Sequence, residues 1–99
     1  MLSSDIRTAD VQTLKARLAA LLYEKSYMEG DFTLSSGRKS DYYFDCRQSS
    51  LNPEGAWLIG SIFFRMLQDS GAQAVAGMTM GADPLVTAVS MAAYDNGLH

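Results

Sequence analysis

The run Ala74–Met80 constrains the fold of this chain more than any other stretch. It is short and apolar, and it does not alternate between apolar and polar residues. This pattern is typical of a strand covered on both faces, as in a parallel sheet. Gly81-Ala82 follows as a turn, and Asp83-Pro84 predicts the start of a helix with Asp83 as its N-cap. A helix, a buried strand, a glycine turn and a further helix form half of an open α/β sheet.

Two amphipathic helices are predicted, one at the start of the chain and one directly before this run. The first spans about residues 9–27, with Thr8 as its N-cap and Gly30 as its end. Its apolar residues recur every three or four positions, which predicts one buried face. That stripe consists of Val11, Leu14, Leu18, Leu21 and Leu22.

The second helix is predicted to begin at Asn52-Pro53, because asparagine is a favourable N-cap and proline is favoured at the first helical position. It extends to about Asp69, and Gly71 ends it. Gly60 lies in its centre, where glycine weakens a helix by about 1 kcal/mol relative to alanine. We therefore expect another backbone to approach closely there. The broad apolar face indicates more than one packing partner and consists of Ala56, Leu58, Ile59, Gly60, Ile62, Phe63, Met66 and Leu67.

The segment Phe32–Asp45 is predicted to form two short strands joined by a polar, basic turn. Tyr43 and Phe44 offer flat aromatic faces, and Arg38 and Lys39 offer positive charge. Together they suit a planar anionic ligand. The alternative is a solvated turn followed by a strand whose aromatic residues face the core, and residue chemistry alone slightly favours that alternative. Residues 46–51 are predicted as a strand end and a loop.

The turn Met80–Asp83 is a second candidate site. It would lie where a strand of an α/β sheet ends, and ligands bind at that end of such sheets. Backbone N–H groups at the start of a helix also attract phosphate. The carboxylate of Asp83 repels an anion, however, so a plain turn capped by Asp83 explains the residues equally well.

Composition and charge exclude several classes of function. The formal net charge is -3, which argues against a general nucleic-acid binder, and no apolar stretch reaches the roughly 18 residues of a membrane helix. Cys46 is the only cysteine and is expected to be a packed small residue in a reducing compartment. His99 is the only histidine, so neither a histidine-based triad nor a protein metal site is expected. We expect a soluble, cytoplasmic protein without nucleic-acid or membrane partners.

A single parallel strand cannot form a sheet, because its backbone groups on both edges lack partners. The next element after residue 97 should be a further strand. We therefore expect residues 1–99 to be one partial, truncated domain of a longer α/β protein. Residues 1–51 would hold the first helix and the hairpin, and residues 52–99 would hold the start of the α/β core.

Two segments in this order resemble the orotate phosphoribosyltransferases. Phe32–Asp45 resembles their N-terminal orotate-binding segment, and Gly77–Pro84 resembles their pyrophosphate-loop region in the form G-x-T-x-G-A-D-P. The resemblance covers about residues 10–97. It implies a type I phosphoribosyltransferase fold, in which a parallel α/β core carries a small hood that includes the hairpin. It also implies transfer of the phosphoribosyl group from phosphoribosyl pyrophosphate to orotate, which gives orotidine 5'-phosphate and pyrophosphate in pyrimidine biosynthesis.

The resemblance implies roles for several residues. Tyr43 and Phe44 match the hood positions that contact the orotate ring. Ser35 stands where some relatives carry a lysine that reaches phosphoribosyl pyrophosphate, and Met80-Gly81 stands where some carry Tyr-Lys. The pyrophosphate end of that substrate would then meet backbone groups of the turn, with Arg38 and Lys39 as possible further anion contacts. The phosphoribosyl-pyrophosphate set is Ser35, Met80, Gly81 and Ala82.

The resemblance further implies magnesium bound mainly by the substrate and a homodimer as the working assembly. Catalytic residues are expected beyond His99, so the isolated 99-residue piece is predicted to be inactive. The alternative function is a non-catalytic nucleotide-sensing or regulatory relative with the same fold.

Overall fold

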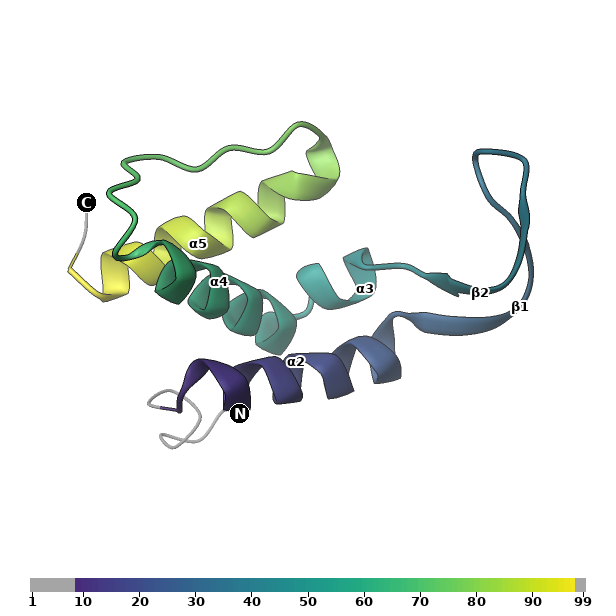
Figure 1. The fold of residues 1–99 in the computed structure, drawn as a ribbon, viewed down its shortest axis with the longest axis horizontal. Coiled ribbons are helices and arrows are strands. Elements are labelled where there is room, and N and C mark those ends of the chain that lie inside the picture. The colour runs from purple at the N-terminus through teal and green to yellow at the C-terminus, as the bar shows by residue number, and fades with distance from the viewer. Residues whose placement is uncertain (1–8, 98–99) are drawn as a thin grey trace.

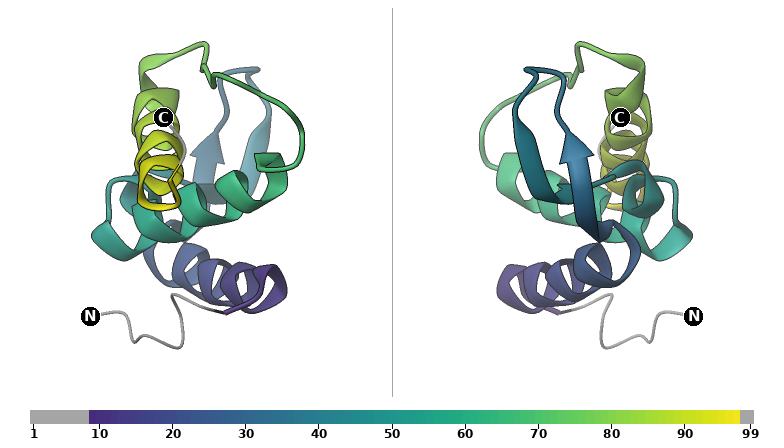
Figure 2. Two further views of the ribbon diagram at one scale, coloured as in Figure 1. Left: turned by 90° about the vertical axis from the view of Figure 1, so that its left-hand side faces the viewer. Right: turned by 90° about the vertical axis from the view of Figure 1, so that its right-hand side faces the viewer.

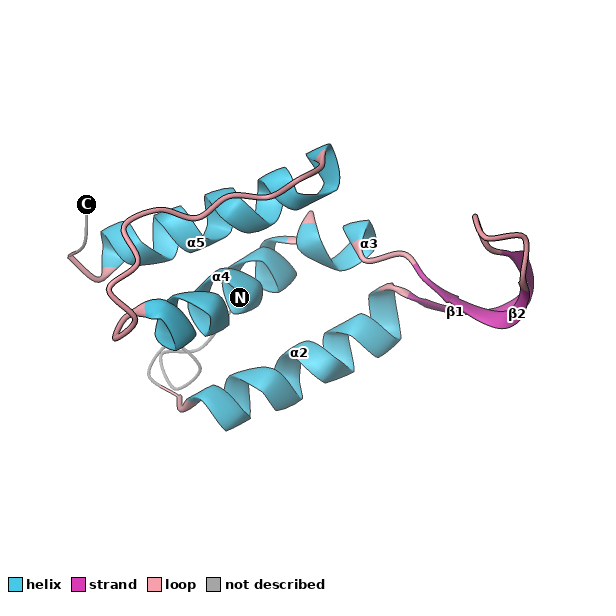
Figure 3. Ribbon diagram, turned by 45° about the horizontal axis from the view of Figure 1, so that its top comes forward, coloured by secondary structure: helices cyan, strands magenta, loops and turns pink. Residues whose placement is uncertain are grey.

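The computed structural model describes residues 9–97, so Thr8 and His99 lie outside the described residues. Helices α2, α4 and α5 lie side by side in that order, and a two-stranded hairpin projects from one end of this helical layer (Figures 1 and 3). The elements are α2 (Val11–Lys25), β1 (Tyr27–Thr33), β2 (Lys39–Phe44), α3 (Arg47–Ser50), α4 (Pro53–Leu67), a 3-10 turn η1 (Met80–Ala82) and α5 (Asp83–Asp95).

Helix α2 packs its apolar stripe against α4, as the sequence predicts. The Asp10 carboxylate caps the helix by accepting a hydrogen bond from the Thr13 amide at 2.8 Å. The helix ends at Lys25 rather than at Tyr27, because Tyr27 already pairs in β1. The buried core comprises Leu14 and Leu21 of α2 with Leu58 and Ile62 of α4.

Helix α4 begins as predicted, with the Asn52 side chain accepting a hydrogen bond from the Gly55 amide at 3.0 Å. The close approach expected at Gly60 is confirmed: a Cβ atom there would overlap the backbone of Ala88 in α5. The buried face is narrower than the sequence indicates, since Phe63 and Met66 are exposed. Only α2, the short α3 and α5 pack extensively on α4 within residues 9–97, so part of its apolar surface is left uncovered.

The hairpin is antiparallel and starts earlier than predicted. Tyr27 pairs with Phe44, and the register shifts between Glu29 and Phe32. Gly30, predicted as a helix end, lies inside β1 at this irregularity with φ 153. Such a bulge bends the strand and requires an unusual backbone conformation, which glycine tolerates. Residues 47–50, predicted as strand end or loop, form the short helix α3 instead.

The predicted strand Ala74–Met80 is not formed. This segment is largely exposed, and residues 73–78 make no backbone hydrogen bonds with any other described residue. The physical reason is the absence of a neighbouring strand within residues 9–97, since an extended segment needs partners along its edges to form a sheet. The segment nevertheless runs back along the helices, so α4 and α5 point in the same direction (Figure 1). This is the chain path of a helix–strand–helix crossover.

Helix α5 begins one residue earlier than predicted. Ala82 occupies the cap position, and Asp83 is the first helical residue. The turn η1 explains the difference, because the Asp83 amide already donates to the Met80 carbonyl and the Asp83 carboxylate makes no capping bond. The helix ends at Asp95, with Asn96 as its C-cap, and Gly97 follows with φ 85. No helix within residues 9–97 has the length and apolarity needed to cross a membrane.

Candidate functional site

The aromatic residues of the hairpin form two separate clusters. In the first, the Tyr27 ring stacks on Tyr23 and packs against Phe44, each with ring centroids 5.2 Å apart. Tyr42 extends this cluster with an edge-on contact to Phe44 at 6.1 Å. In the second, Tyr43 contacts Phe32 at 5.7 Å.

The two residues predicted to contact a planar ligand, Tyr43 and Phe44, therefore belong to different clusters. Tyr43 and Phe44 are consecutive in β2, and successive side chains of a strand point to opposite faces. The two residues are 42% and 45% exposed, so each is partly open to solvent. In this arrangement a flat ligand can stack on one of the two rings. The residue that carries the other ring can contribute its backbone groups at the open edge of β2.

The basic turn between the strands is exposed. It is closed by hydrogen bonds from the Leu34 amide to the Arg38 carbonyl and from the Gly37 amide to the Leu34 carbonyl, both at 2.8 Å. Gly37 has φ 85, a left-handed conformation that favours glycine. Ser35, Arg38 and Lys39 lie here, and neither cation forms an ion pair with another described residue. The turn can therefore offer two positive charges to an anion.

The part of the hairpin between its base and its turn has the opposite charge. The Tyr27 hydroxyl donates a hydrogen bond to Glu29 at 3.1 Å. Burial, together with this bond, raises the pKa of Tyr27 above its usual value. Asp31 and Asp41 line the same shallow depression as Tyr27 and Glu29. An anionic ligand is therefore favoured at the tip of the hairpin rather than at this acidic surface.

The predicted pyrophosphate turn forms η1 and the start of α5. Met80 and Gly81 are exposed, and Ala82 is half-buried. The Ala82 amide donates to the Thr79 carbonyl at 2.9 Å. The Gly81 amide, by contrast, makes no hydrogen bond with another residue of 9–97. Gly77 lies so close to Ala82 that any side chain at position 77 would overlap it.

The structure does not bring the two predicted sites together. The hairpin projects from the ends of α2 and α3, whereas η1 lies at the start of α5, well away from it (Figure 1). Viewed along the layer, both stand on the same side of α4 (Figure 2). The described residues contain no group of three or more histidine, cysteine, aspartate or glutamate side chains placed to hold a metal.

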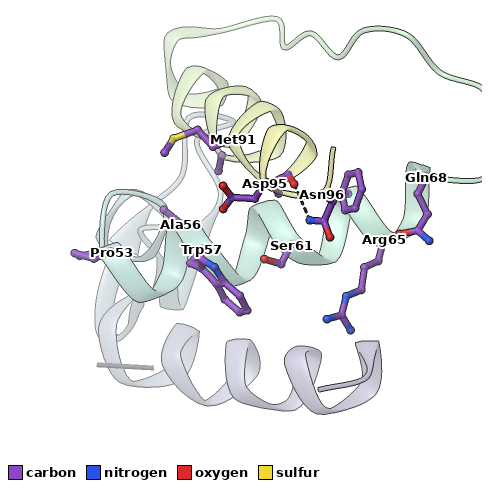
Figure 4. A pocket seen from close by; sticks show the side chains of 12 residues that line it. Pro53, Ala56, Trp57, Ser61, Arg65, Gln68, Met91, Asp95 and Asn96 are labelled. Atoms are coloured by element: carbon purple, nitrogen blue, oxygen red, sulfur yellow. Dashed lines mark hydrogen bonds between the residues drawn. The ribbon is translucent and has the colours of Figure 1, made fainter. Parts of the chain in front are cut away.

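A groove between α4 and α5 lies apart from both sites. Trp57 and Arg65 of α4 and Asp95 of α5 are among its lining residues (Figure 4). None of the residues predicted to bind substrate lines this groove. Arg65 of α4 also donates a hydrogen bond to the Ala9 carbonyl just before α2, so it connects α4 to the start of α2.

Sequence reasoning missed the residues at the base of the hairpin. Asp45 accepts hydrogen bonds from Arg47 and Gln48, which lower the pKa of its carboxyl below the usual value. Cys46, expected to be packed, is exposed at the N-cap position of α3. Ser26 and Ser49 are fully buried, although isolated serines in a sequence give no sign of burial.

Comparison with known proteins identifies the class first by fold. An orotate phosphoribosyltransferase of Mycobacterium tuberculosis, solved in complex with Fe(III) dicitrate, superimposes with a TM-score of 0.71 and 41% sequence identity over 77% of this chain and 45% of its own. A Corynebacterium diphtheriae phosphoribosyltransferase gives a TM-score of 0.70 with 35% identity over 81% of this chain and 44% of its own. The fold is thus that of part of a phosphoribosyltransferase.

The relatives found by sequence define the class more closely than the fold does. The chain is 54% identical over 90 residues to an orotate phosphoribosyltransferase of Nostoc sp., which covers 90% of this chain and 43% of the relative. A second such enzyme, from Thermosynechococcus vestitus, is 53% identical over 79% of this chain and 41% of its own length. No family model matches the chain. The resemblance to the orotate phosphoribosyltransferases is confirmed, and the chain spans less than half the length of these relatives.

Proposed function

We propose that the protein to which this chain contributes is an orotate phosphoribosyltransferase. One observation carries the proposal: the identity of 54% extends over 90% of the chain. Only about a tenth of the chain lies outside that alignment, so it must include both Phe32–Asp45 and Gly77–Pro84. The reaction transfers the phosphoribosyl group from phosphoribosyl pyrophosphate to orotate and releases pyrophosphate.

The hairpin would hold the orotate. Orotate is flat and anionic, so an exposed ring of Tyr43 or Phe44 suits its flat face. The cations Arg38 and Lys39, at the opposite end of the hairpin, attract its negative charge from a distance. Holding the ring nitrogen in place against the ribose is a large part of the catalysis, because a fixed geometry lowers the entropic barrier of the transfer.

The turn η1 would meet the pyrophosphate end of the second substrate. Cleavage at the ribose carbon builds negative charge on the leaving pyrophosphate, and donors that are already in place stabilise it. The Gly81 amide is such a donor, and Met80 and Ala82 adjoin it in the same turn. Ser35, in the turn of the hairpin, would contact the same substrate from the other site. Magnesium would bind mainly to the pyrophosphate and the ribose hydroxyls.

Assembly as a homodimer and a cytoplasmic location belong to the same proposal. The uncovered apolar side chains Phe63 and Met66 on α4 are compatible with further packing against the rest of the protein or a second subunit. The single, exposed Cys46 is compatible with a reducing compartment.

The test is an assay of the protein expressed from its complete coding sequence. We expect orotidine 5'-phosphate from orotate and phosphoribosyl pyrophosphate, and loss of the activity when a chelator removes magnesium. Activity with a purine base and none with orotate would contradict the proposal. A protein that binds both substrates without turnover would instead be the regulatory relative.

A further inference from the structure

The two ends of the hairpin meet at a single residue, Ser26. Its amide donates to the Leu22 carbonyl at 2.9 Å, so it completes the last turn of α2. Its carbonyl accepts a hydrogen bond from the Asp45 amide, also at 2.9 Å, directly after β2. Ser26 therefore joins the strand that leaves α2 to the strand that returns.

The side chain of Ser26 adds a third connection. Its Oγ lies 2.6 Å from the Oγ of Ser49 in α3, and both residues are 0% exposed. No other hydrogen bond is made by either hydroxyl within the described residues. Each hydroxyl thus depends on the other, because a buried polar group without a partner is strongly unfavourable.

Ser49 is itself fixed to α4. Its carbonyl accepts a hydrogen bond from the Asn52 amide at 3.1 Å. Gly55 packs so closely on the same carbonyl that a side chain at position 55 would overlap it. The hydroxyl pair consequently links the base of the hairpin to the start of α4.

Beyond this base the hairpin has little other support. Its rings pack on one another and on Tyr23, not on the core around Leu14 and Leu58. Figure 1 shows it projecting from the helical layer. A two-stranded hairpin is only marginally stable by itself, so its direction must be set where it is attached.

We propose that Ser26 and Ser49 are positioning residues that set the direction of the hairpin and thereby the placement of Tyr43 and Phe44. The inference rests on the proposed function, because it assigns the hairpin to orotate. It adds that two buried hydroxyls, which touch no substrate, tune the use of orotate from the base of the hairpin.

The kinetic test compares S26A, S49A and the double variant S26A/S49A in the protein expressed from its complete coding sequence. We expect each variant to raise the KM for orotate by about fivefold or more, because this is the effect of losing the free energy of one hydrogen bond. The KM for phosphoribosyl pyrophosphate should change by less than about twofold. S90A is the matched control, since Ser90 makes an exposed side-chain bond to the Val86 carbonyl.

The double variant separates positioning from folding. Removing both hydroxyls leaves no unpaired buried group, so its melting temperature should exceed that of the less stable single variant. Positioning predicts that its KM for orotate stays high. A double variant with wild-type KM values, or equal changes in both KM values, would overturn the proposal.

A measurement without substrate tests the geometry directly. Spin labels at Q12C on α2 and S36C in the exposed turn report the distance between helix and hairpin tip by electron paramagnetic resonance. Cys46 and any cysteine beyond residue 99 are replaced by serine in the labelled protein. We expect a narrow distance distribution with both serines and a broader or shifted one in S26A/S49A. An unchanged distribution would refute the positioning role. If the wild-type protein forms no orotidine 5'-phosphate, the proposed function fails, while this measurement still decides how the hairpin is held.

Discussion

Gly60 of α4 lies so close to Ala88 of α5 that a Cβ atom at position 60 would overlap the Ala88 carbonyl group. The contact sets the spacing of two helices that run in the same direction (Figure 1). It therefore also fixes where the segment between them, and the turn η1 at its end, can lie.

Replacing this glycine should destabilise the protein. In G60A the new methyl group must displace the backbone of α5, and overpacking of this kind typically costs about 1–3 kcal/mol, against a gain in helix propensity of about 1 kcal/mol. We expect a net loss of up to about 2 kcal/mol in the free energy of unfolding, measured by urea denaturation. S61A, the neighbouring position in the same helix, is the control, and an equal loss there would contradict the steric explanation.

An ion pair between α2 and α4 should make a smaller, salt-dependent contribution. Arg17 binds Glu54 through two hydrogen bonds, at 2.6 and 2.9 Å, in a forked geometry. Both side chains are partly exposed, so solvent and salt screen the interaction. A double-mutant cycle with R17A and E54A should show a favourable coupling that shrinks as sodium chloride is added. A coupling independent of salt would show that the contact acts by packing.

The ring of Phe44 should matter more for orotate than for phosphoribosyl pyrophosphate. Stacking of a base on an aromatic side chain contributes about 1–3 kcal/mol, so F44A should raise the KM for orotate by roughly tenfold. Y42A removes a neighbour of Phe44 in the same aromatic cluster and tests whether loss of packing alone explains the effect. Equal losses on both substrates in F44A would point to a folding role.

Acid should weaken the attachment of the hairpin through Asp45. Hydrogen bonds from Arg47 and Gln48 lower the pKa of its carboxyl in the folded protein. The stabilisation is therefore complete above the unfolded-state pKa of about 4 and is lost as the pH falls through the lowered folded value.

In D45N this carboxylate is absent at every pH, so the melting temperature should fall less between about pH 5 and pH 2 than in the wild type. The control is D31N, which removes an exposed carboxylate of β1. Parallel pH profiles for D45N and the wild type would show that the carboxylate contributes nothing.

Much of the helical part of this fold can be predicted because its signals are local. Asn52-Pro53 marks the start of α4 with a cap and a first-turn residue, and the spacing of Leu14 and Leu21 marks the buried face of α2. Gly60 predicts a close helix contact because glycine has no other advantage in the middle of a helix. The bulge at Gly30 cannot be predicted from sequence, because a glycine that permits a bulge looks the same in sequence as one that ends a helix.

The strand and the site are less predictable because they depend on distant partners. Ala74–Met80 has the composition of a buried strand, yet strand formation requires neighbours that residues 9–97 do not provide. The sequence predicts that Tyr43 and Phe44 contact the same ligand ring, and only the strand geometry separates them into two clusters. The buried pair of Ser26 and Ser49 left no pattern, because the two residues meet only after the hairpin has closed.

The unpaired segment 73–78 has a practical consequence for handling this polypeptide. It contains no charged residue and no proline, and its amide and carbonyl groups make no hydrogen bonds with other residues of 9–97. Extended chains of this kind readily add to one another edge to edge. Expressed as 99 residues alone, the polypeptide should collect in inclusion bodies or precipitate as its concentration rises, and a lysine in place of Val75 should keep more of it in solution.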